Sequence, residues 1–159
     1  MPSKGLATFS AGFSLIELIS VIVILATIAT LAAPRFVHHE ATVPAQADQL
    51  GRIIRHAQAL AMSLGRPHTV DIQSATSYAI TDGATPSPSI IRDPSGQLQS
   101  FSLANGVTLA GADVEFDSLG RPISGSNLVT NSQSWTLSGG SNTATVSIQA
   151  VTGFVSVTP

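Results

Sequence analysis

The hydrophobic positions of the chain follow three successive patterns. From Phe13 to Ala33 almost every residue is apolar, and Glu17 is the only charge. From Ala45 to Leu64 apolar residues recur at the i, i+3, i+4, i+7 spacing of one helix face. From residue 68 onward, short runs rich in Val, Ile and Thr are divided by Gly, Pro, Asn and Asp, as in antiparallel strands and turns. The pattern predicts an α+β chain, in which a long N-terminal helix, hydrophobic and then amphipathic, packs on a small antiparallel β-sandwich.

The apolar run is long enough to cross a membrane. Phe13–Ala33 is 21 residues, and a helix rises about 1.5 Å per residue. A secretory signal peptide places its cleavage site after the apolar core. Here a polar stretch that carries Lys4 comes first and Gly12 stands directly before the run. A cut at Gly12 would therefore remove the leader and keep the helix, with the N-terminus inside. An ordinary signal anchor is the alternative.

Glu17 is out of place in such a helix. A carboxylate at the centre of a membrane helix costs roughly 2.5–3.5 kcal/mol on insertion scales, and less near an end. Either Glu17 lies close enough to the helix start to reach the interface, or it serves as a charge partner inside the apolar layer. Because residues i and i+4 share a helix face, Glu17 could also pair with an amino group at Phe13.

Two prolines divide the helical part of the chain. Pro34 and Pro44 each lack a backbone N–H donor, so each is expected to kink or break a helix. The amphipathic helix predicted at Ala45–Leu64 should lie on a sheet and end at Gly65-Arg66-Pro67. Its Arg52, Arg55 and His56 form a small basic face, which is either a partner or phosphate contact or simply solvated.

The last part of the chain has the signals of strands and turns. Asn105-Gly106 and Thr152-Gly153 are predicted tight turns, and the proline-rich segment Ala84–Gln97 is predicted to be a loop. The predicted strands are His68–Gln73, Ser77–Thr81, Ser100–Leu103, Val107–Leu109, Val114–Phe116, Ser134–Leu137, Thr143–Gln149 and Phe154–Val157.

Composition and motifs argue against several functions. Hydrophobic residues make up 43% of the chain and charged residues 10%, with no cysteine. Without residues 1–12 the chain keeps six arginines and nine acidic residues, so nothing predicts a general attraction to nucleic acid. No hydrolase, metalloprotease or nucleotide-binding motif is present, so we expect neither an enzyme nor a cofactor. One weak metal candidate remains. Asp113, Glu115 and Asp117 would share one strand face and could offer carboxylate oxygens to calcium, although a solvated face is the preferred interpretation because a calcium site needs more ligands than these three.

The segment Gly12-Phe13-Ser14-Leu15-Ile16-Glu17 resembles the prepilin processing motif. Pro34 also falls where the N-terminal helices of type IV pilins usually carry a proline. The resemblance implies that prepilin peptidase removes residues 1–12 and methylates the amino group of Phe13. It also implies that Glu17 neutralises the Phe13 ammonium of a neighbouring subunit. The implied organisation is a leader at 1–12, a transmembrane and assembly helix at 13–37, an amphipathic continuation at 38–67, and a β-rich domain at 68–159.

Later segments are similar to the GspH/FimT-type minor pilins and pseudopilins. They are ADQLGRIIRHAQALAMSLGRPHTVDI, the turn FDSLGRP, and the closing VSIQAVTGFVSV. This resemblance implies a pilin-like fold and a non-enzymatic minor subunit of a type IV pilus or a type II secretion pseudopilus, acting in filament assembly or initiation. The implied partners are other pilin or pseudopilin subunits, prepilin peptidase and the bacterial inner membrane, with the globular domain in the periplasm before it enters a filament.

Three alternatives remain open at the level of sequence. The chain could be a major pilin, or a pilus-borne adhesin or DNA-binding minor pilin, or a membrane-anchored hydrolase. The closing strand, Phe154 to Thr158, carries no basic residue. DNA-uptake members of the family would be expected to carry a positive tail or patch, so nucleic acid is not an expected partner.

Overall fold

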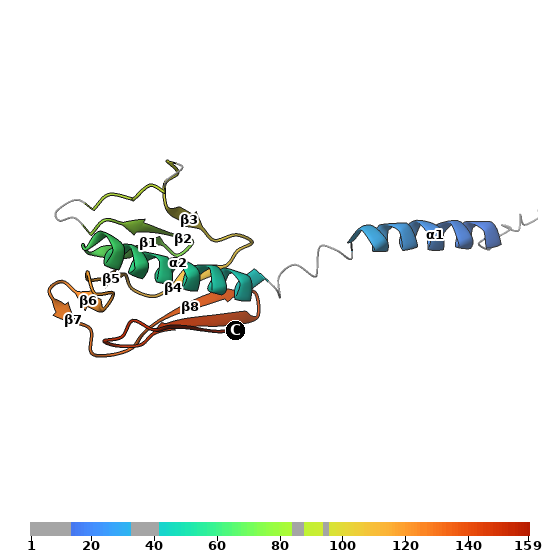
Figure 1. Ribbon diagram of the computed structural model, residues 1–159. Coiled ribbons are helices and arrows are strands. Elements are labelled where there is room, and N and C mark those ends of the chain that lie inside the picture. Colours follow the sequence, from blue (N-terminus) through green and yellow to red (C-terminus); the bar gives the residue numbers. More distant parts are fainter. Residues whose placement is uncertain (1–13, 33–41, 84–87, 94–95) are drawn as a thin grey trace, which may run out of the picture. The chain divides into compact units, whose positions relative to one another are not determined.

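The chain consists of two compact units, residues 1–37 and 38–159, each of which is described by itself. The computed structural model describes residues 14–32, 42–83, 88–93 and 96–159. The first unit contains helix α1 (Leu15–Ala32), and the second contains helix α2 (Thr42–Leu64) followed by ten strands (Figure 1). Among the residues whose side chains are described, every buried hydrophobic one lies between Val43 and Val155, so the second unit carries a core of its own.

Helix α2 confirms the predicted amphipathic helix and begins three residues earlier than expected. Pro44 was expected to kink or break a helix, but it lies in the first turn of α2, where a missing N–H donor costs nothing. The kink expected at Pro34 lies outside the described residues. The helix ends as predicted, because Gly65 adopts the left-handed conformation that stops many helices, with φ of +64°. One face of α2 is buried, through Val43, Ala47, Leu50, Gly51, Ile54, Ala57 and Ala61.

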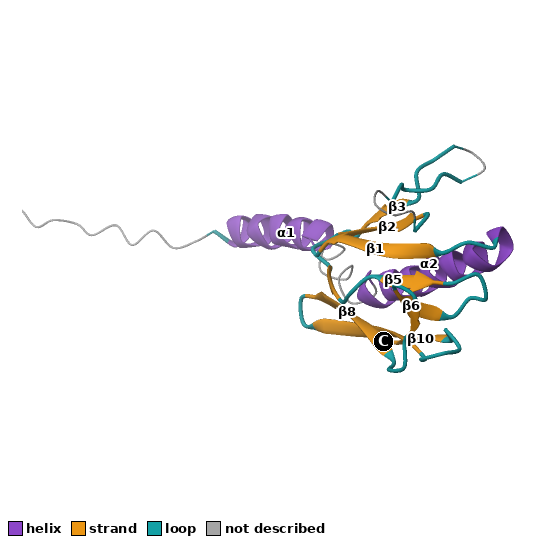
Figure 2. Cartoon of the chain, turned by 90° about the vertical axis from the view of Figure 1, so that its left-hand side faces the viewer, coloured by secondary structure: helices purple, strands orange, loops and turns teal. Residues whose placement is uncertain are grey.

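The strands form two antiparallel sheets, seen as orange arrows in Figure 2. The six-stranded sheet has the order β3-β2-β1-β5-β6-β7 and the four-stranded sheet the order β10-β9-β8-β4. The first comprises β1 (His68–Ser74), β2 (Ser77–Thr81), β3 (Ser100–Ser102), β5 (Val114–Phe116), β6 (Pro122–Ser124) and β7 (Asn127–Leu128). The second comprises β4 (Thr108–Ala110), β8 (Gln133–Gly139), β9 (Asn142–Ile148) and β10 (Val155–Thr158).

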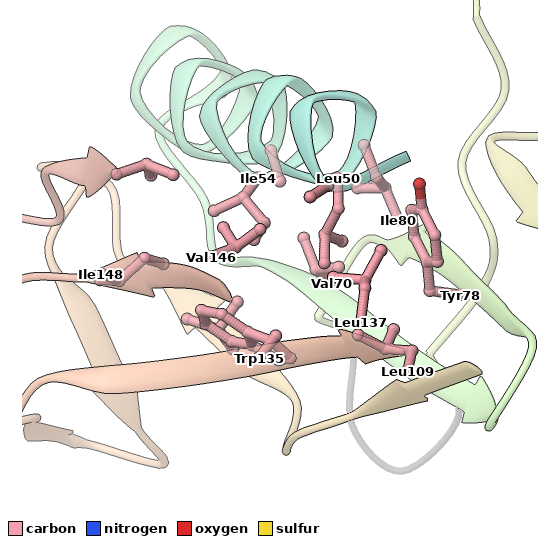
Figure 3. Packing of buried hydrophobic residues seen from close by; sticks show 14 of the residues in the cluster. Leu50, Ile54, Val70, Tyr78, Ile80, Leu109, Trp135, Leu137, Val146 and Ile148 are labelled. Atoms are coloured by element: carbon pink, nitrogen blue, oxygen red, sulfur yellow. The ribbon is translucent and has the colours of Figure 1, made fainter. Parts of the chain in front are cut away.

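The core lies where α2 meets both sheets. Figure 3 shows Leu50 and Ile54 of α2 directed at Val70 of the first sheet and at Val146 of the second. The approach is close, since a Cβ on Gly51 would lie 2.7 Å from Cγ2 of Val157. Helix α2 therefore holds the two sheets together through one continuous core.

Trp135 is buried in that core without leaving a polar atom unpaired. Its indole Nε1–H donates to the carbonyl oxygen of Ala112 at 2.7 Å. A Cβ on Gly111 would collide with the indole ring, so glycine is required beside it. The only tryptophan of the chain is thus fixed on both its polar and its apolar side.

The outer edges of the four-stranded sheet are covered. At β4, the N–H of Leu109 donates to the carbonyl oxygen of Ala75 at 2.7 Å, which ties this edge to the other sheet. At β10, Nη2 of Arg55 donates to the carbonyl oxygen of Val155 at 3.1 Å. Each of these bonds occupies one backbone group that an added strand would otherwise pair with.

Eight of the ten strands match the predicted ones to within about two residues at each end. The other two, β6 and β7, were missed because they hold three and two residues and show no alternation that could reveal them. Both turn predictions are confirmed. Asn105 and Gly106 have φ of 57° and 72°, and Gly153 has φ of 67°. The predicted loop at 84–97 includes two isolated bridges in its described part, Thr81 with Ile90 and Arg92 with Leu98.

Candidate assembly surface

In helix α1 the side chains of Leu15 to Ile28 are described, and all of them are exposed. The 18 residues of the helix correspond to about 27 Å of length. Large aliphatic side chains point to all sides, with exposed fractions from 45% at Val21 to 76% at Leu15. A helix that is apolar all round is stable only when it is surrounded by protein or lipid. The surface of α1 is therefore the first candidate for assembly.

The described polar side chains of α1 are two hydroxyls that are satisfied within the helix and one carboxylate. Ser20 Oγ donates to the carbonyl oxygen of Ile16 at 2.8 Å, and Thr27 Oγ1 donates to that of Ile24 at 2.8 Å. Such bonds let a hydroxyl sit in an apolar environment without an outside partner. Glu17 lies in the first turn, where the helix dipole favours a negative charge. In the described part of the chain, no ion pair is formed by its carboxylate.

The remaining residues expected at this end lie outside the described part of the chain. They are Gly12 and Phe13 of the processing motif, and Pro34. Of the transmembrane segment expected at 13–37, the structure describes α1 and the residue before it. Among the residues whose side chains are described, no helix is both long and apolar enough to cross a membrane.

The basic face of α2 has a structural component. Arg55 is the residue that donates to the carbonyl oxygen of Val155, so it fastens α2 to the edge of β10. Arg52 and His56 are exposed. Asp48, four residues before Arg52, forms no ion pair within the described residues. The sequence did not distinguish Arg55 from its neighbours, because the strand it contacts lies 100 residues away.

The structure places the weak calcium candidates Asp113, Glu115 and Asp117 around one short strand. Strand β5 has three residues, so only Glu115 belongs to it and the two aspartates lie at its ends. Asp113 Oδ1 accepts the N–H of Ile72 at 2.8 Å. In the described part of the chain no three His, Asp or Glu residues are placed to hold a metal ion.

Asp117 fastens the turn between β5 and β6. Its Oδ1 accepts the N–H groups of Leu119 and Arg121, both at 2.9 Å. Its Oδ2 accepts Nε of Arg121 at 2.8 Å and forms an ion pair with Nη2 at 2.7 Å. Burial alone would raise the pKa of Asp117, but the contacts with Arg121 and Leu119 outweigh it and hold the pKa below its ordinary value. The turn predicted from FDSLGRP is thus held together by the hydrogen bonds and the ion pair of Asp117, one of its own residues.

Sequence reasoning did not predict that Asp71 lies beside Asp113 and Glu115. It lines a shallow hollow of about 180 Å³ together with Asp113 and Glu115. Burial raises the pKa of Asp71, and the charge of Asp113 raises it further. Burial also raises the pKa of Glu115. The pairing of β1 with β5 creates this arrangement, and no sequence spacing could reveal it.

Gln58 is a second contact that sequence reasoning missed. Its Nε2 donates to the carbonyl oxygen of Gly120 at 2.7 Å and to that of Thr152 at 3.5 Å. One side chain thus joins α2 to the β5–β6 turn and to the β9–β10 turn.

Exposed apolar side chains lie on the three segments that Gln58 joins. We call these four residues the loop patch: Met62, Leu119, Val151 and Phe154, with exposed fractions of 52%, 66%, 49% and 65%. Val151 is also held at a φ of 66°, which is unfavourable for a β-branched residue. The loop patch is the second candidate contact surface.

Comparison with known proteins gave a match in fold and none in sequence. No protein-family model matches the chain, and no curated protein matches its sequence. Two crystal structures of the type IV minor pilin FimU from Pseudomonas aeruginosa are similar. The first has a TM-score of 0.54 and 14% identity, and the alignment covers 74% of this chain and 88% of FimU. The second, in another crystal form, has a TM-score of 0.51 and 13% identity, with 71% and 90% covered. The chain therefore has the type IV pilin-like fold, an N-terminal helix packed on antiparallel sheets.

The hydrogen bonds and the ion pair of Asp117 predict that the free energy of unfolding depends on pH. Because its pKa is lowered on folding, its contribution is present above the pKa of the unfolded chain, about 3.9, and is lost as the pH falls through the folded value. We expect Asp117→Ala to lower the free energy of unfolding by about 1–3 kcal/mol at neutral pH. Asp117→Asn keeps an acceptor for the two N–H groups and should lose less. Urea unfolding followed by Trp135 fluorescence measures both.

The control for this experiment is Ser118→Ala in the same turn, which changes an exposed side chain. The stability gap between the native protein and Asp117→Asn should narrow as the pH falls through the lowered folded pKa of Asp117. A gap that stays constant with pH would show that the Arg121 ion pair contributes nothing.

Proposed function

We propose that the chain is a minor pilin, a non-enzymatic subunit that acts in the assembly or initiation of a type IV pilus-like filament. One observation carries the proposal: α1 is exposed and apolar on all sides and has a single carboxylate in its first turn. Such a helix needs an apolar layer around it, and a bundle of neighbouring subunits supplies one. The similarity of fold to FimU supports the same role. A type II secretion pseudopilin is the nearest alternative.

Assembly begins in the inner membrane. The apolar run Phe13–Ala33 is inserted there, and it is then extracted into a helical bundle of other subunits. The transfer moves apolar surface from lipid to protein, so the hydrophobic effect contributes little net free energy. Close packing and the charge of Glu17 then decide the register between neighbours, because opposite charges attract strongly in a medium of low dielectric constant.

Processing follows from the motif around Gly12. Prepilin peptidase cuts after Gly12 and methylates the new amino group of Phe13, so the mature chain begins at N-methyl-Phe13. The cut exposes an ammonium group four residues before Glu17. Intact mass spectrometry of the protein from its natural membrane measures the mature N-terminus. A chain that still begins at Met1, or that was cut after the apolar run, would exclude the pilin assignment.

Several features favour a minor subunit over a major one. The β-rich part, residues 68–159, is large for the repeating unit of a thin filament. It has no cysteine pair to tie down its surface, although a bulk subunit meets shear and proteases along the whole filament. The loop patch adds a local apolar surface suited to a contact with one specific neighbour.

Substitution of Glu17 separates insertion from assembly. Glu17→Ala removes a charge from an apolar helix, so it should enter the membrane at least as well as the native chain. Its amount in filaments should fall by at least about tenfold, because the ammonium of a neighbouring Phe13 loses its partner. The measurement is the amount of the chain in the membrane fraction and in the sheared filament fraction.

Ser20→Ala is the matched control for Glu17→Ala. Its hydroxyl bonds only to its own helix, so its loss should leave both fractions unchanged. Glu17→Gln keeps the shape without the charge and should behave like Glu17→Ala. Native levels of Glu17→Ala in filaments would disprove the charge pair, and a defect of equal size in Ser20→Ala would attribute the loss to packing.

A further inference from the structure

A hollow of about 300 Å³ lies where the end of α2 meets the segment after β2. Its apolar wall includes Leu60 and Leu64 of α2 and Ile91 of that segment. Two guanidinium groups also line it, from Arg66 after the helix end and from Arg92 opposite. We call it the Arg66–Arg92 hollow. Its volume is at the lower end of the range for small-molecule sites.

The wall of the hollow is pinned to the sheet. The N–H of Ile91 donates to the carbonyl oxygen of Ile80 at 3.0 Å. Arg92 Nη1 donates to the carbonyl oxygen of Gly96 at 2.7 Å, which fixes the guanidinium and leaves its other N–H groups free to bind. These contacts fix the guanidinium group of Arg92 and the apolar side chain of Ile91 in place before a ligand binds.

The backbone at Arg66, the second cation of the hollow, is held by His68. The Nδ1–H of His68 donates to the carbonyl oxygen of Arg66 at 3.0 Å, which fixes the backbone that carries Arg66. The side chain of His68 is fully buried and its Nε2 is closed off from solvent without a partner. His68 lines the hollow as well, and because its side chain is fully buried we treat it as a positioning residue for Arg66.

The arginines of the domain differ in whether a carboxylate or a strand edge of the fold holds them. The domain at 45–159 has five arginines and seven acidic residues. Arg121 is held by Asp117, and Arg55 by the edge of β10. Within the described residues neither Arg66 nor Arg92 forms an ion pair. Arg52 also forms no ion pair in the described part of the domain, and of these three arginines Arg66 and Arg92 line the same hollow.

Asp82 also lines the hollow and limits its positive charge. Its Oδ1 accepts the N–H of Ser89 at 3.0 Å, so part of the carboxylate is engaged by the backbone. Two guanidinium groups against one carboxylate leave a net positive lining. A guanidinium binds a planar carboxylate through two parallel hydrogen bonds.

We propose that the Arg66–Arg92 hollow binds a small carboxylic acid with an apolar body. The carboxylate pairs with the two guanidinium groups, and the apolar body packs against Leu60, Leu64 and Ile91. The proposal is independent of the role in filaments. A phosphate group alone would satisfy the cations but would leave the apolar wall uncovered.

Calorimetric titration of residues 38–159, which hold the complete core, tests the site. The probe is 4-methylpentanoate, and 4-methylpentanamide and inorganic phosphate are the comparison ligands. The carboxylate should bind saturably. The amide should bind at least about tenfold more weakly because it cannot form a charged hydrogen-bonded pair with the arginines. Phosphate should also bind at least about tenfold more weakly, because it makes no apolar contact with the wall. Arg66→Gln and Arg92→Gln should each weaken the carboxylate by about tenfold.

Arg52→Gln is the matched control, because Arg52 is exposed on the same helix and does not line the hollow. It should bind the carboxylate as the native domain does. Arg66 and Arg92 are exposed, so their variants should keep the native melting temperature. No saturable binding, equal binding of the amide or phosphate, or an equal loss in Arg52→Gln would each overturn the proposal.

Discussion

The packing of α2 against both sheets is the contact on which the globular domain depends. Its buried face runs from Val43 to Ala61, and strands of both sheets meet it. Gly51 lets the helix approach β10, and Arg55 then bonds to the edge of that strand. Neither sheet could bury its inner face without this helix, because the helix and the two sheets share one core.

The polar groups of the described surfaces are partly satisfied within the fold. On the outer strands of the four-stranded sheet, the N–H of Leu109 bonds to the carbonyl oxygen of Ala75, and the carbonyl oxygen of Val155 accepts Nη2 of Arg55. Among the described side chains of α1, the hydroxyls of Ser20 and Thr27 bond to their own helix. The aliphatic side chains and Glu17 are then the groups of α1 that the proposed assembly would use.

The sequence predicted most of the elements because their signals are local. The apolar stripe of α2, the strand of alternating residues at β9 and the Asn105-Gly106 turn each depend on a few neighbouring residues. Strands β6 and β7 are too short for such a signal. The fold class followed from the order of helix and strands, and it agrees with the structure.

The site residues were harder to predict because they depend on contacts between distant segments. Asp113 and Asp117 have the spacing of one strand face, but strand β5 consists only of the three residues between them. Each of the two carboxylates bonds to backbone N–H groups instead. Arg55 and Gln58 contact segments that lie 62 to 100 residues away. Those partners are set by the pairing of strands, which a single sequence does not specify.

The most direct test of the account is the amount of this chain in purified filaments. Sheared filaments from the natural host would be digested and measured by quantitative mass spectrometry, with peptides from residues 42–159 compared with those of the dominant subunit. The account predicts that the chain is present at a small fraction of the dominant subunit. Its absence from filaments would contradict the role in assembly, and a signal equal to the dominant subunit would contradict the minor role.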